Sequence, residues 1–229
     1  MKLGIIGNGR AAWAFASTWR RIGWPLTGIA TRGEPIEDLA ATSDIILIAV
    51  TDRAIAEVAE SIPETNAIII HPSGALPAVR GGFSLQPLKS LPPVGEPSDL
   101  EGTLLVFEGA HREIAEQIAT AAGARFAEIS RDAKIRYHAG AVFGSNYIAA
   151  LLDIAEELIG IEGVREDIAS LARSAIDNWA AHTDARRFTG PAARGDDAVL
   201  RRHEDALRDR PELAEIYRLL AARIVAAAK

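Results

Sequence analysis

The start of the chain constrains the fold most strongly, because a glycine turn follows an apolar strand there. Gly7, Gly9 and Ala12 have the G-x-G-x-x-G/A spacing of a dinucleotide-binding turn. The first glycine of such a turn permits a tight strand-to-helix connection, the second lets the backbone approach a pyrophosphate, and the third small residue allows close helix–strand packing. The helix N-terminus then presents free N–H groups to the anion. The alternative is a glycine-rich turn without a ligand.

The residues around the turn favour the dinucleotide-binding interpretation. Residues 1–6 are typical of a buried strand, and apolar side chains recur at helical spacing after the glycines, as at Ala11, Phe15 and Trp19. We therefore predict that the turn and the first helical residues hold the cofactor. These predicted cofactor-binding residues are Gly7, Asn8, Gly9, Arg10, Ala11 and Ala12.

The end of the next expected strand, residues 25–30, bears on which nicotinamide cofactor would bind. NAD enzymes usually place Asp or Glu about 20 residues beyond the glycines, where it binds the ribose 2′-hydroxyl. Here the strand ends in Thr31 and Arg32. A hydroxyl and a guanidinium bind a 2′-phosphate, whereas a carboxylate would repel it. The sequence thus predicts NADP(H) in preference to NAD(H), unless Arg32 is only a solvated loop residue.

The composition excludes several classes of function. The 229 residues are 48% hydrophobic, and with a formal net charge of −6 they show no basic patch for nucleic acid. The apolar run at residues 45–50 is far shorter than the ~18 residues of a membrane span, and the first strand leaves no room for a signal peptide. Cysteine is absent, which excludes disulfides, zinc–thiolate sites and cysteine nucleophiles. We therefore expect a cytoplasmic protein without a metal, a membrane or a nucleic-acid partner.

The two halves of the chain differ in texture. Residues 1–130 alternate short apolar runs with helical segments, which predicts a doubly wound, Rossmann-like parallel sheet. Residues 131–229 are rich in Ala and Leu at helical spacing, which predicts an all-α domain for substrate binding and dimerisation. A cleft between the two domains would be the natural ligand site.

Apolar stripes predict the long helices of the second half. The first stripe predicts one helix of more than about 20 residues with a buried face. Its members are Ala141, Ser145, Ile148, Leu152, Ala155 and Ile159. Two further helices follow from the stripes Ile168, Leu171, Ala175, Trp179 and, after Pro211, Leu213, Ile216, Leu220, Ile224.

Polar loops follow the expected strands at residues 50–52, 71–74 and 86–88. Open α/β sheets bind ligands at the carboxyl ends of their strands, so the first two loops are expected to border the ribose and nicotinamide of a cofactor. His71 is predicted to bind substrate, or else to be a strand-end histidine satisfied by the backbone. The cofactor-binding residues predicted here are Val50, Thr51, Asp52, Ser73 and Gly74.

Lys134 and His138 lie four residues apart, so they share one helix face. Such a pair suits proton donation to a carbonyl oxygen or an imine during hydride transfer, and two adjacent cations would lower each other's pKa. We predict both as catalytic residues. Alternatively, Lys134 is a solvated lysine of the first helical turn.

Other polar residues of the second half are predicted to bind substrate. Ser145 and Asn146 interrupt a helical run, which suggests a polar contact, either with substrate or between helices. Arg194 could clamp a carboxylate, and Asp196 could instead cap a helix. His203, from the following helix, completes this predicted set.

These segments in this order resemble a family of bacterial proteins that join a Rossmann-like NADP-binding domain to a helical C-terminal domain of unknown function. The wider group is similar to ketopantoate reductase, pyrroline-5-carboxylate reductase and 6-phosphogluconate dehydrogenase. The resemblance implies that Lys134 is the proton donor and His138 its partner. It rests on residues 6–10, 50–52, 71–74, 134–140, 145–146, 189–191, 194–196 and 203.

Two segments depart from the family pattern. Gln86-Pro87 stands where family members usually have His-Pro. Only 11 residues, Gly33 to Ser43, separate the second strand from Asp44, where the usual pattern has a full helix and a further strand. We expect this deletion to thin the wall of the adenosine site.

The sequence as a whole predicts a homodimeric, NADPH-dependent reductase of a small carbonyl compound, such as an oxo acid, or of an imine. The alternative is a non-catalytic protein that senses a nucleotide or a metabolite. Nucleotide binding without turnover of any substrate would favour the non-catalytic protein over the reductase.

Overall fold

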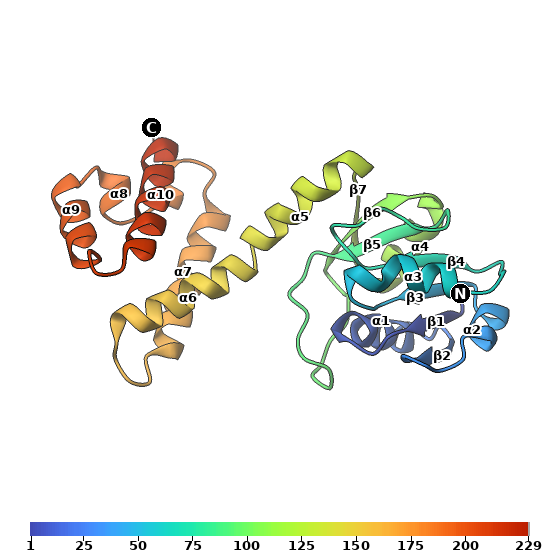
Figure 1. Cartoon of the computed structure of the whole chain (residues 1–229). Coiled ribbons are helices and arrows are strands. Elements are labelled where there is room, and N and C mark those ends of the chain that lie inside the picture. The colour runs from blue at the N-terminus through green and yellow to red at the C-terminus, as the bar shows by residue number, and fades with distance from the viewer. Residues whose placement is uncertain (229) are drawn as a thin grey trace. The chain divides into compact units, whose positions relative to one another are not determined.

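The computed structural model describes residues 1–228, and their contacts form two compact units (Figure 1). The first unit is Met1–Tyr147 and contains a seven-stranded sheet with helices; the second begins at Ile148 and is helical. The predicted class, a Rossmann-like α/β sheet followed by an all-α region, is confirmed. The last strand of the sheet ends at Glu128. The domain boundary predicted near residue 130 stays a prediction.

The sheet has the strand order β2-β1-β3-β4-β5-β6-β7. All neighbouring strands are parallel except β5 and β6, which pair antiparallel. The sequence did not predict this reversal. A parallel connection needs a long crossover, and the Pro- and Gly-containing residues 88–103 form no helix. The strands are β1 Leu3–Ile6, β2 Leu26–Ala30, β3 Ile45–Ile48, β4 Ile68–His71, β5 Phe83–Pro87, β6 Leu104–Gly109 and β7 Arg125–Glu128.

Helices cover both faces of the sheet, and each face has its own apolar core. One core contains Phe15 and Trp19 of α1 (Arg10–Arg21) and Ile118 of α4 (Arg112–Ala122). The other contains Leu39 of α2 (Glu37–Thr42) and Ile55 of α3 (Asp52–Ser61). Successive residues of β1 and β3 alternate between the two cores, as a sheet buried on both faces requires.

The connection after β2 is short, as the sequence showed. Residues 33–43 contain only the six-residue helix α2, and β2 is left at the edge of the sheet. This edge of the sheet is therefore built from one short helix and a loop, and the thinner wall of an adenosine site there stays a prediction.

The single long helix predicted from the apolar stripe at residues 141–159 is wrong. The chain forms α5 (Lys134–Phe143) and α6 (Asn146–Ile159), separated by a turn at Gly144 and Ser145. Glycine weakens a helix, and the Ser145 amide donates to the Val142 carbonyl, three residues back instead of four. The predicted stripe is also not fully buried, because its members are half-buried and Ile159 is exposed.

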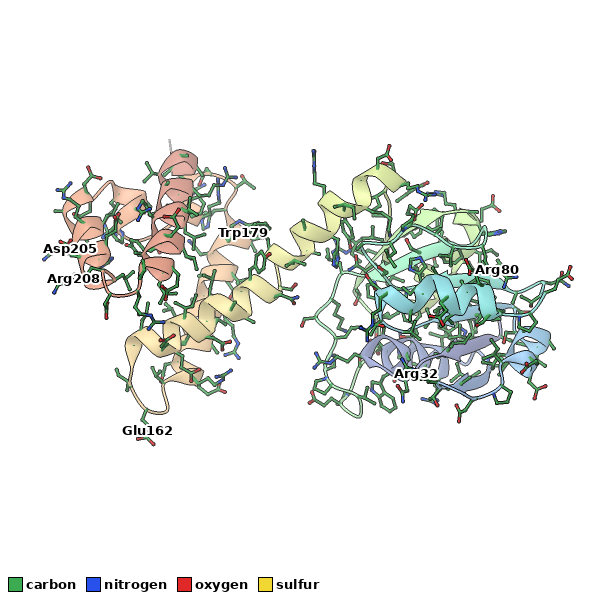
Figure 2. All side chains as sticks on the ribbon, in the orientation of Figure 1. Arg32, Arg80, Glu162, Trp179, Asp205 and Arg208 are labelled. Carbon is green, nitrogen blue, oxygen red and sulfur yellow. The ribbon has the colours of Figure 1, made fainter. Side chains whose placement is uncertain are left out.

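The second unit has only a small core, formed by Leu207, Leu213 and Ala214. The stripe predicted on α7 is not buried as expected: Ile168 is 5% exposed, but Leu171 is 68% and Trp179 63% exposed (Figure 2). No helix within residues 1–228 is long and apolar enough to cross a membrane. The remaining helices are η1 Arg131–Ala133 in the first unit and α7 Arg165–Ala181, η2 Ala185–Arg187, α8 Pro191–Arg194, α9 Asp197–Ala206 and α10 Pro211–Ala228.

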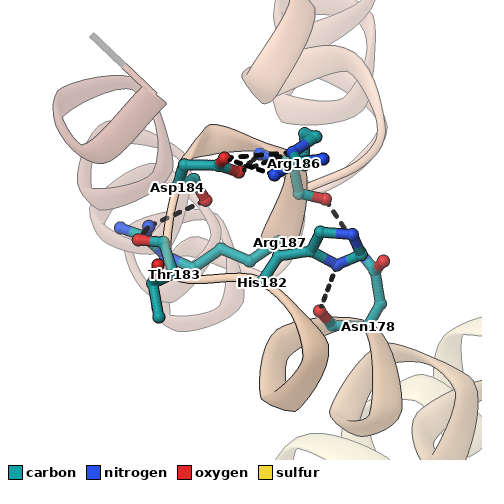
Figure 3. A network of polar contacts seen from close by, with 6 residues as sticks. All are labelled: Asn178, His182, Thr183, Asp184, Arg186 and Arg187. Carbon is teal, nitrogen blue, oxygen red and sulfur yellow. Dashed lines mark hydrogen bonds and ion pairs between the residues drawn. The ribbon is translucent and has the colours of Figure 1, made fainter.

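A polar network fixes the turn between α7 and η2 (Figure 3). The Asn178 amide donates to the Arg186 carbonyl at 3.0 Å, and His182 bonds back to the Asn178 carbonyl at 3.0 Å. Asp184 accepts from the Arg186 amide and pairs with its guanidinium at 2.8 Å. These bonds, the side-chain one first, lower the pKa of Asp184 to about 2. The network is local and lies on an exposed surface.

Candidate functional site

A cavity of about 870 Å³ lies where the carboxyl ends of β1, β2 and β3 meet. Its walls are the glycine turn and start of α1, residues 31–34 after β2, and residues 49–51 after β3. Ligands of open α/β sheets bind at this edge, where the strand order reverses. The cavity is also within the size range of small-molecule and cofactor sites.

Gly7 makes the close approach that shapes this edge. Its φ is +117°, and a Cβ at this position would lie 2.3 Å from the Ala49 carbonyl oxygen. Its amide donates to the Ala30 carbonyl at 2.8 Å, and the Ala49 amide donates to the Ile6 carbonyl at 2.8 Å. Any side chain would push β3 away from the turn, so only glycine fits.

The space around the Cα of Gly9 is open, in contrast to the crowded surroundings of Gly7. It is the N-cap residue of α1 with φ −79°, and a Cβ here would meet no described atom within 4 Å. No side chain caps the first turn of α1, and that turn holds no acidic residue. The first amides of the helix are thus available to an anion in the cavity.

The cavity wall also contains a carboxylate, Glu34, that was not predicted from the sequence. Glu34 accepts hydrogen bonds from the Thr31 amide at 2.5 Å and from the Thr31 hydroxyl at 2.9 Å. The backbone hydrogen bond is the first cause of the lowered pKa of Glu34. The signal was present, because Thr-x-x-Glu is the spacing of a capping box.

Nine of the predicted cofactor-binding residues line the cavity and four do not. Ala12 is 2% exposed and packs in the core, Asp52 and Ser73 are bonded to each other, and Gly74 packs against Gln86. The cavity also includes Glu34 and Glu57, which were not predicted. The nine lining residues are Gly7, Asn8, Gly9, Arg10, Ala11, Thr31, Arg32, Val50 and Thr51.

Lys134 lies in a buried polar cluster of the first unit. It is 2% exposed, and its Nζ donates to the Ser84 hydroxyl at 2.6 Å and to the Ser73 carbonyl at 3.2 Å. It is therefore not a solvated lysine. Burial lowers the pKa of the Lys134 ammonium, and the carboxylates of Glu108 and Asp52 partly oppose that effect.

His71 is fully buried in the same cluster and is bonded to backbone groups, which agrees with the alternative of a strand-end histidine satisfied by the backbone. Its Nδ1 accepts from the Ser73 amide at 3.2 Å, and its Nε2 lies 2.9 Å from the Pro77 carbonyl oxygen. Because a carbonyl can only accept, Nε2 carries the proton and the ring is neutral. Burial is the main cause of its lowered pKa, and the Lys134 ammonium lowers that pKa further. The Lys134 ammonium therefore interacts electrostatically with the imidazole of His71.

Ser73 connects the cluster to the cavity wall. Its hydroxyl donates to the Asp52 carboxylate at 2.9 Å and accepts from the amides of Ala75 and Leu76. Asp52 directly follows Thr51, which lines the cavity. Hydrogen bonds therefore run from a residue beside the cavity wall, through Ser73, to Lys134.

Three buried polar atoms on neighbouring segments have no partner within the described residues: Gln86 Oε1, His138 Nδ1 and the Tyr137 hydroxyl. Burial raises the pKa of Tyr137 to about 12. The side chain of Gln86 packs so closely that a Cβ on Gly74 would lie 2.4 Å from its Oε1. His138 lies one turn after Lys134, but the hydrogen bonds of Lys134 go to Ser84 and Ser73.

The other predicted substrate residues have mostly local partners. Ser145 donates to the Ala141 carbonyl at 2.6 Å, and Asn146 is exposed at the start of α6. In the second unit Arg194 is exposed, Asp196 caps α9 through the Val199 amide, and His203 bonds the Tyr217 hydroxyl at 2.7 Å. The structure thus brings Lys134 and His71 together within the first unit, whereas Arg194, Asp196 and His203 belong to the second unit.

The sheet, its covering helices and the glycine turn define a Rossmann-like fold with a helical C-terminal region. The family described as "Domain of unknown function (DUF2520)" matches residues 104–224, more than half of the chain. The chain belongs to this family. Among curated proteins, no sequence matches it.

Solved structures share the fold over nearly the whole chain. The "putative NADP oxidoreductase BF3122" of Bacteroides fragilis is 19% identical, with a TM-score of 0.81 over 98% of this chain and 97% of that one. Pyrroline-5-carboxylate reductase from Streptococcus pyogenes is 14% identical, with a TM-score of 0.65 over 100% and 98%. The Plasmodium falciparum pyrroline carboxylate reductase, solved with NADP bound, is 12% identical, with a TM-score of 0.63 over 100% of both chains.

The lowered pKa of His71 predicts a loss of stability in mild acid. Below the unfolded pKa of 6.5 the unfolded chain takes up a proton that the folded chain does not bind until the pH falls through the lowered folded pKa. In this window the free energy of unfolding falls by up to about 1.4 kcal/mol per pH unit. The loss, measured by urea unfolding from pH 7.5 downward, should be smaller in His71→Gln. The variant His111→Asn, at an exposed position, should keep the full loss; equal losses in His71→Gln and wild type would contradict the prediction.

Proposed function

We propose that the protein is a nicotinamide-nucleotide-dependent oxidoreductase that prefers NADP(H) and reduces a small carbonyl compound, such as an oxo acid, or an imine. The observation that carries the proposal is the uncapped N-terminus of α1, which opens into a cavity at the carboxyl edge of the sheet. The NADP named for a structural neighbour of the same fold supports the choice of cofactor.

The lining residues fit an extended dinucleotide. The amides after Gly9 would hold the diphosphate, because they are free and no carboxylate stands in that turn. Thr31 and Arg32 would hold the adenosine end, with Arg32 as the cation for a 2′-phosphate, and Val50 and Thr51 would contact the second half. When bound, the nicotinamide would supply the hydride.

Lys134 is proposed as the proton donor and His138 as its partner. The lowered pKa of the ammonium favours release of its proton at Nζ. For this step, Nζ must exchange its bond with the Ser84 hydroxyl for one with the substrate oxygen or nitrogen. His71, Ser145 and Asn146 are proposed to orient the substrate, and the roles predicted for Arg194, Asp196 and His203 stay predictions.

A second candidate function is nucleotide binding without catalysis. The burial of Lys134 favours it, because the ammonium is 2% exposed and both of its hydrogen-bond acceptors belong to the protein. In that case Lys134 would only attach α5 to the sheet.

Turnover separates these two functions. NADPH consumption is measured by absorbance with a panel of oxo acids and cyclic imines, using wild type, Lys134→Met and Arg136→Met. Arg136 lies on the same helix but is exposed, so its variant is a control for the loss of a cation. We expect Lys134→Met to lower kcat by about 100-fold or more, the range for loss of a proton donor, with NADPH affinity retained.

Equal turnover in Lys134→Met and wild type would remove the lysine from the mechanism. NADPH binding without turnover on any substrate would support the second candidate. Absence of NADPH binding would contradict both.

We also propose that the chain forms a homodimer through its helical unit, acts in the cytoplasm and belongs to the wider group that includes 6-phosphogluconate dehydrogenase. Large apolar side chains that are more than 60% exposed support the dimer, among them Leu171 on α7 and Leu219 on α10. Trp179 on α7 is another (Figure 2). The core of this unit is small, so these apolar side chains are left exposed to water, which is unfavourable. A second copy of the chain could cover them.

Light scattering tests the dimer. The wild type should have twice the mass of the 24.4 kDa chain, and the double variant Leu171→Glu/Trp179→Glu should be monomeric. Arg173→Glu, about 200° around α7 from Leu171, is the control and should stay dimeric. A monomeric wild type would contradict the proposal.

A further inference from the structure

The loop after β2 closes on itself through Glu34. The Glu34 amide donates to the Thr31 carbonyl at 3.1 Å, and the Thr31 amide and hydroxyl both donate to Glu34 Oε2, at 2.5 and 2.9 Å. Gly33 has a φ of +86°, which allows this tight turn. One carboxylate oxygen therefore accepts hydrogen bonds from both polar donors of Thr31.

Thr31 lies in the part of the cavity that is proposed to bind the adenosine end of the nucleotide. Thr31, Arg32 and Glu34 all line the cavity that begins at the first turn of α1. Thr31 is the first residue after β2, the position that recognises the 2′ substituent of an adenosine ribose in this fold class. A 2′-phosphate at this place would need the Thr31 donors that Glu34 already holds.

The cavity holds equal numbers of positive and negative side chains, but no ion pair within the described residues neutralises the Glu34 carboxylate. The charged residues that line the cavity are Arg10, Arg32, Glu34 and Glu57, two of each sign. Within residues 1–228 no ion pair joins Arg32 to Glu34. A phosphate monoester brings about −1.5 to −2 charges at neutral pH, and it would lie next to an ionised carboxylate.

We propose that Glu34 is a specificity-determining residue that acts against 2′-phosphorylated nucleotides and so opposes the attraction of Arg32. Its carboxylate holds the Thr31 donors and repels the phosphate, whereas it can accept a hydrogen bond from a free 2′-hydroxyl. The inference rests on the proposed function, since it assumes that the cavity binds the adenosine end of a cofactor. The preference for NADP(H) is then limited by a residue of the same loop.

The hydrogen bonds from Thr31 also keep this carboxylate charged. They lower the pKa of Glu34 below its ordinary value of 4.5, so the carboxylate stays ionised in the neutral range and to a lower pH than a free glutamate. Glu34 is exposed, and solvent therefore screens its effect on a neighbouring phosphate.

The test compares two probes that differ at the 2′ position. Adenosine 2′,5′-bisphosphate and 5′-AMP are titrated by calorimetry into wild type, Glu34→Gln and Glu37→Gln, and NADPH and NADH are titrated in parallel. Glu34→Gln keeps a carbonyl acceptor for Thr31 but removes the charge. Glu37 is exposed, lies three residues further along at the start of α2 and does not line the cavity, so its variant is a matched control.

We expect Glu34→Gln to bind adenosine 2′,5′-bisphosphate about 3- to 10-fold more tightly, as suits one exposed charge pair. The affinity for 5′-AMP should not rise, and Glu37→Gln should resemble wild type with both probes. NADPH and NADH should follow the same pattern.

Two results would overturn the inference in different ways. If Glu34→Gln changes the affinities for the two probes equally, or changes neither, Glu34 does not determine specificity, while binding of NADPH by wild type leaves the proposed function intact. If wild type binds none of the four nucleotides, the proposed function fails, and the inference about Glu34 fails with it.

Discussion

The close contact between Gly7 and the Ala49 carbonyl is the constraint on which the site depends. A side chain at residue 7 would separate β1 from β3 at their carboxyl ends, because its Cβ would lie 2.3 Å from that oxygen. With glycine there, the chain turns at once into α1 and leaves the first helical amides uncapped beside the cavity. In the proposed function, backbone groups thus form the anion site, and side chains only border it.

A second constraint connects the cavity to the helix that follows the sheet. Lys134, the first residue of α5, is held by groups at the ends of β4 and β5. Ser73 is bonded to Asp52 at the start of α3, so α3, the loop after β4, β5 and α5 are joined by one set of polar contacts. A buried ammonium that lost these partners would be costly, and the cluster therefore fixes the start of α5 on the first unit.

Local rules made much of this predictable. The glycine turn, the strand–helix alternation and the short connection after β2 follow from backbone geometry and periodicity. The antiparallel pairing of β5 with β6 and the burial of Lys134 depend on contacts between segments far apart in the chain, which one sequence does not reveal. Two other features did have local signals in the sequence. Gly144 marks the break between α5 and α6, although the apolar stripe continues across it. The Thr31–Glu34 capping box follows from the Thr-x-x-Glu spacing, although Glu34 lies beyond the end of the strand, where the acidic residue of an NAD site is expected.

The most direct measurement of the central claim is calorimetric titration of ADP-ribose into wild type and Gly9→Val. The added side chain meets no protein atom at its Cβ but enters the space over the α1 amides. The account predicts one site per wild-type chain and a more than about 10-fold weaker affinity in Gly9→Val, with an unfolding free energy lowered by no more than about 1 kcal/mol. Equal affinities for the two proteins, or no binding by wild type, would contradict it.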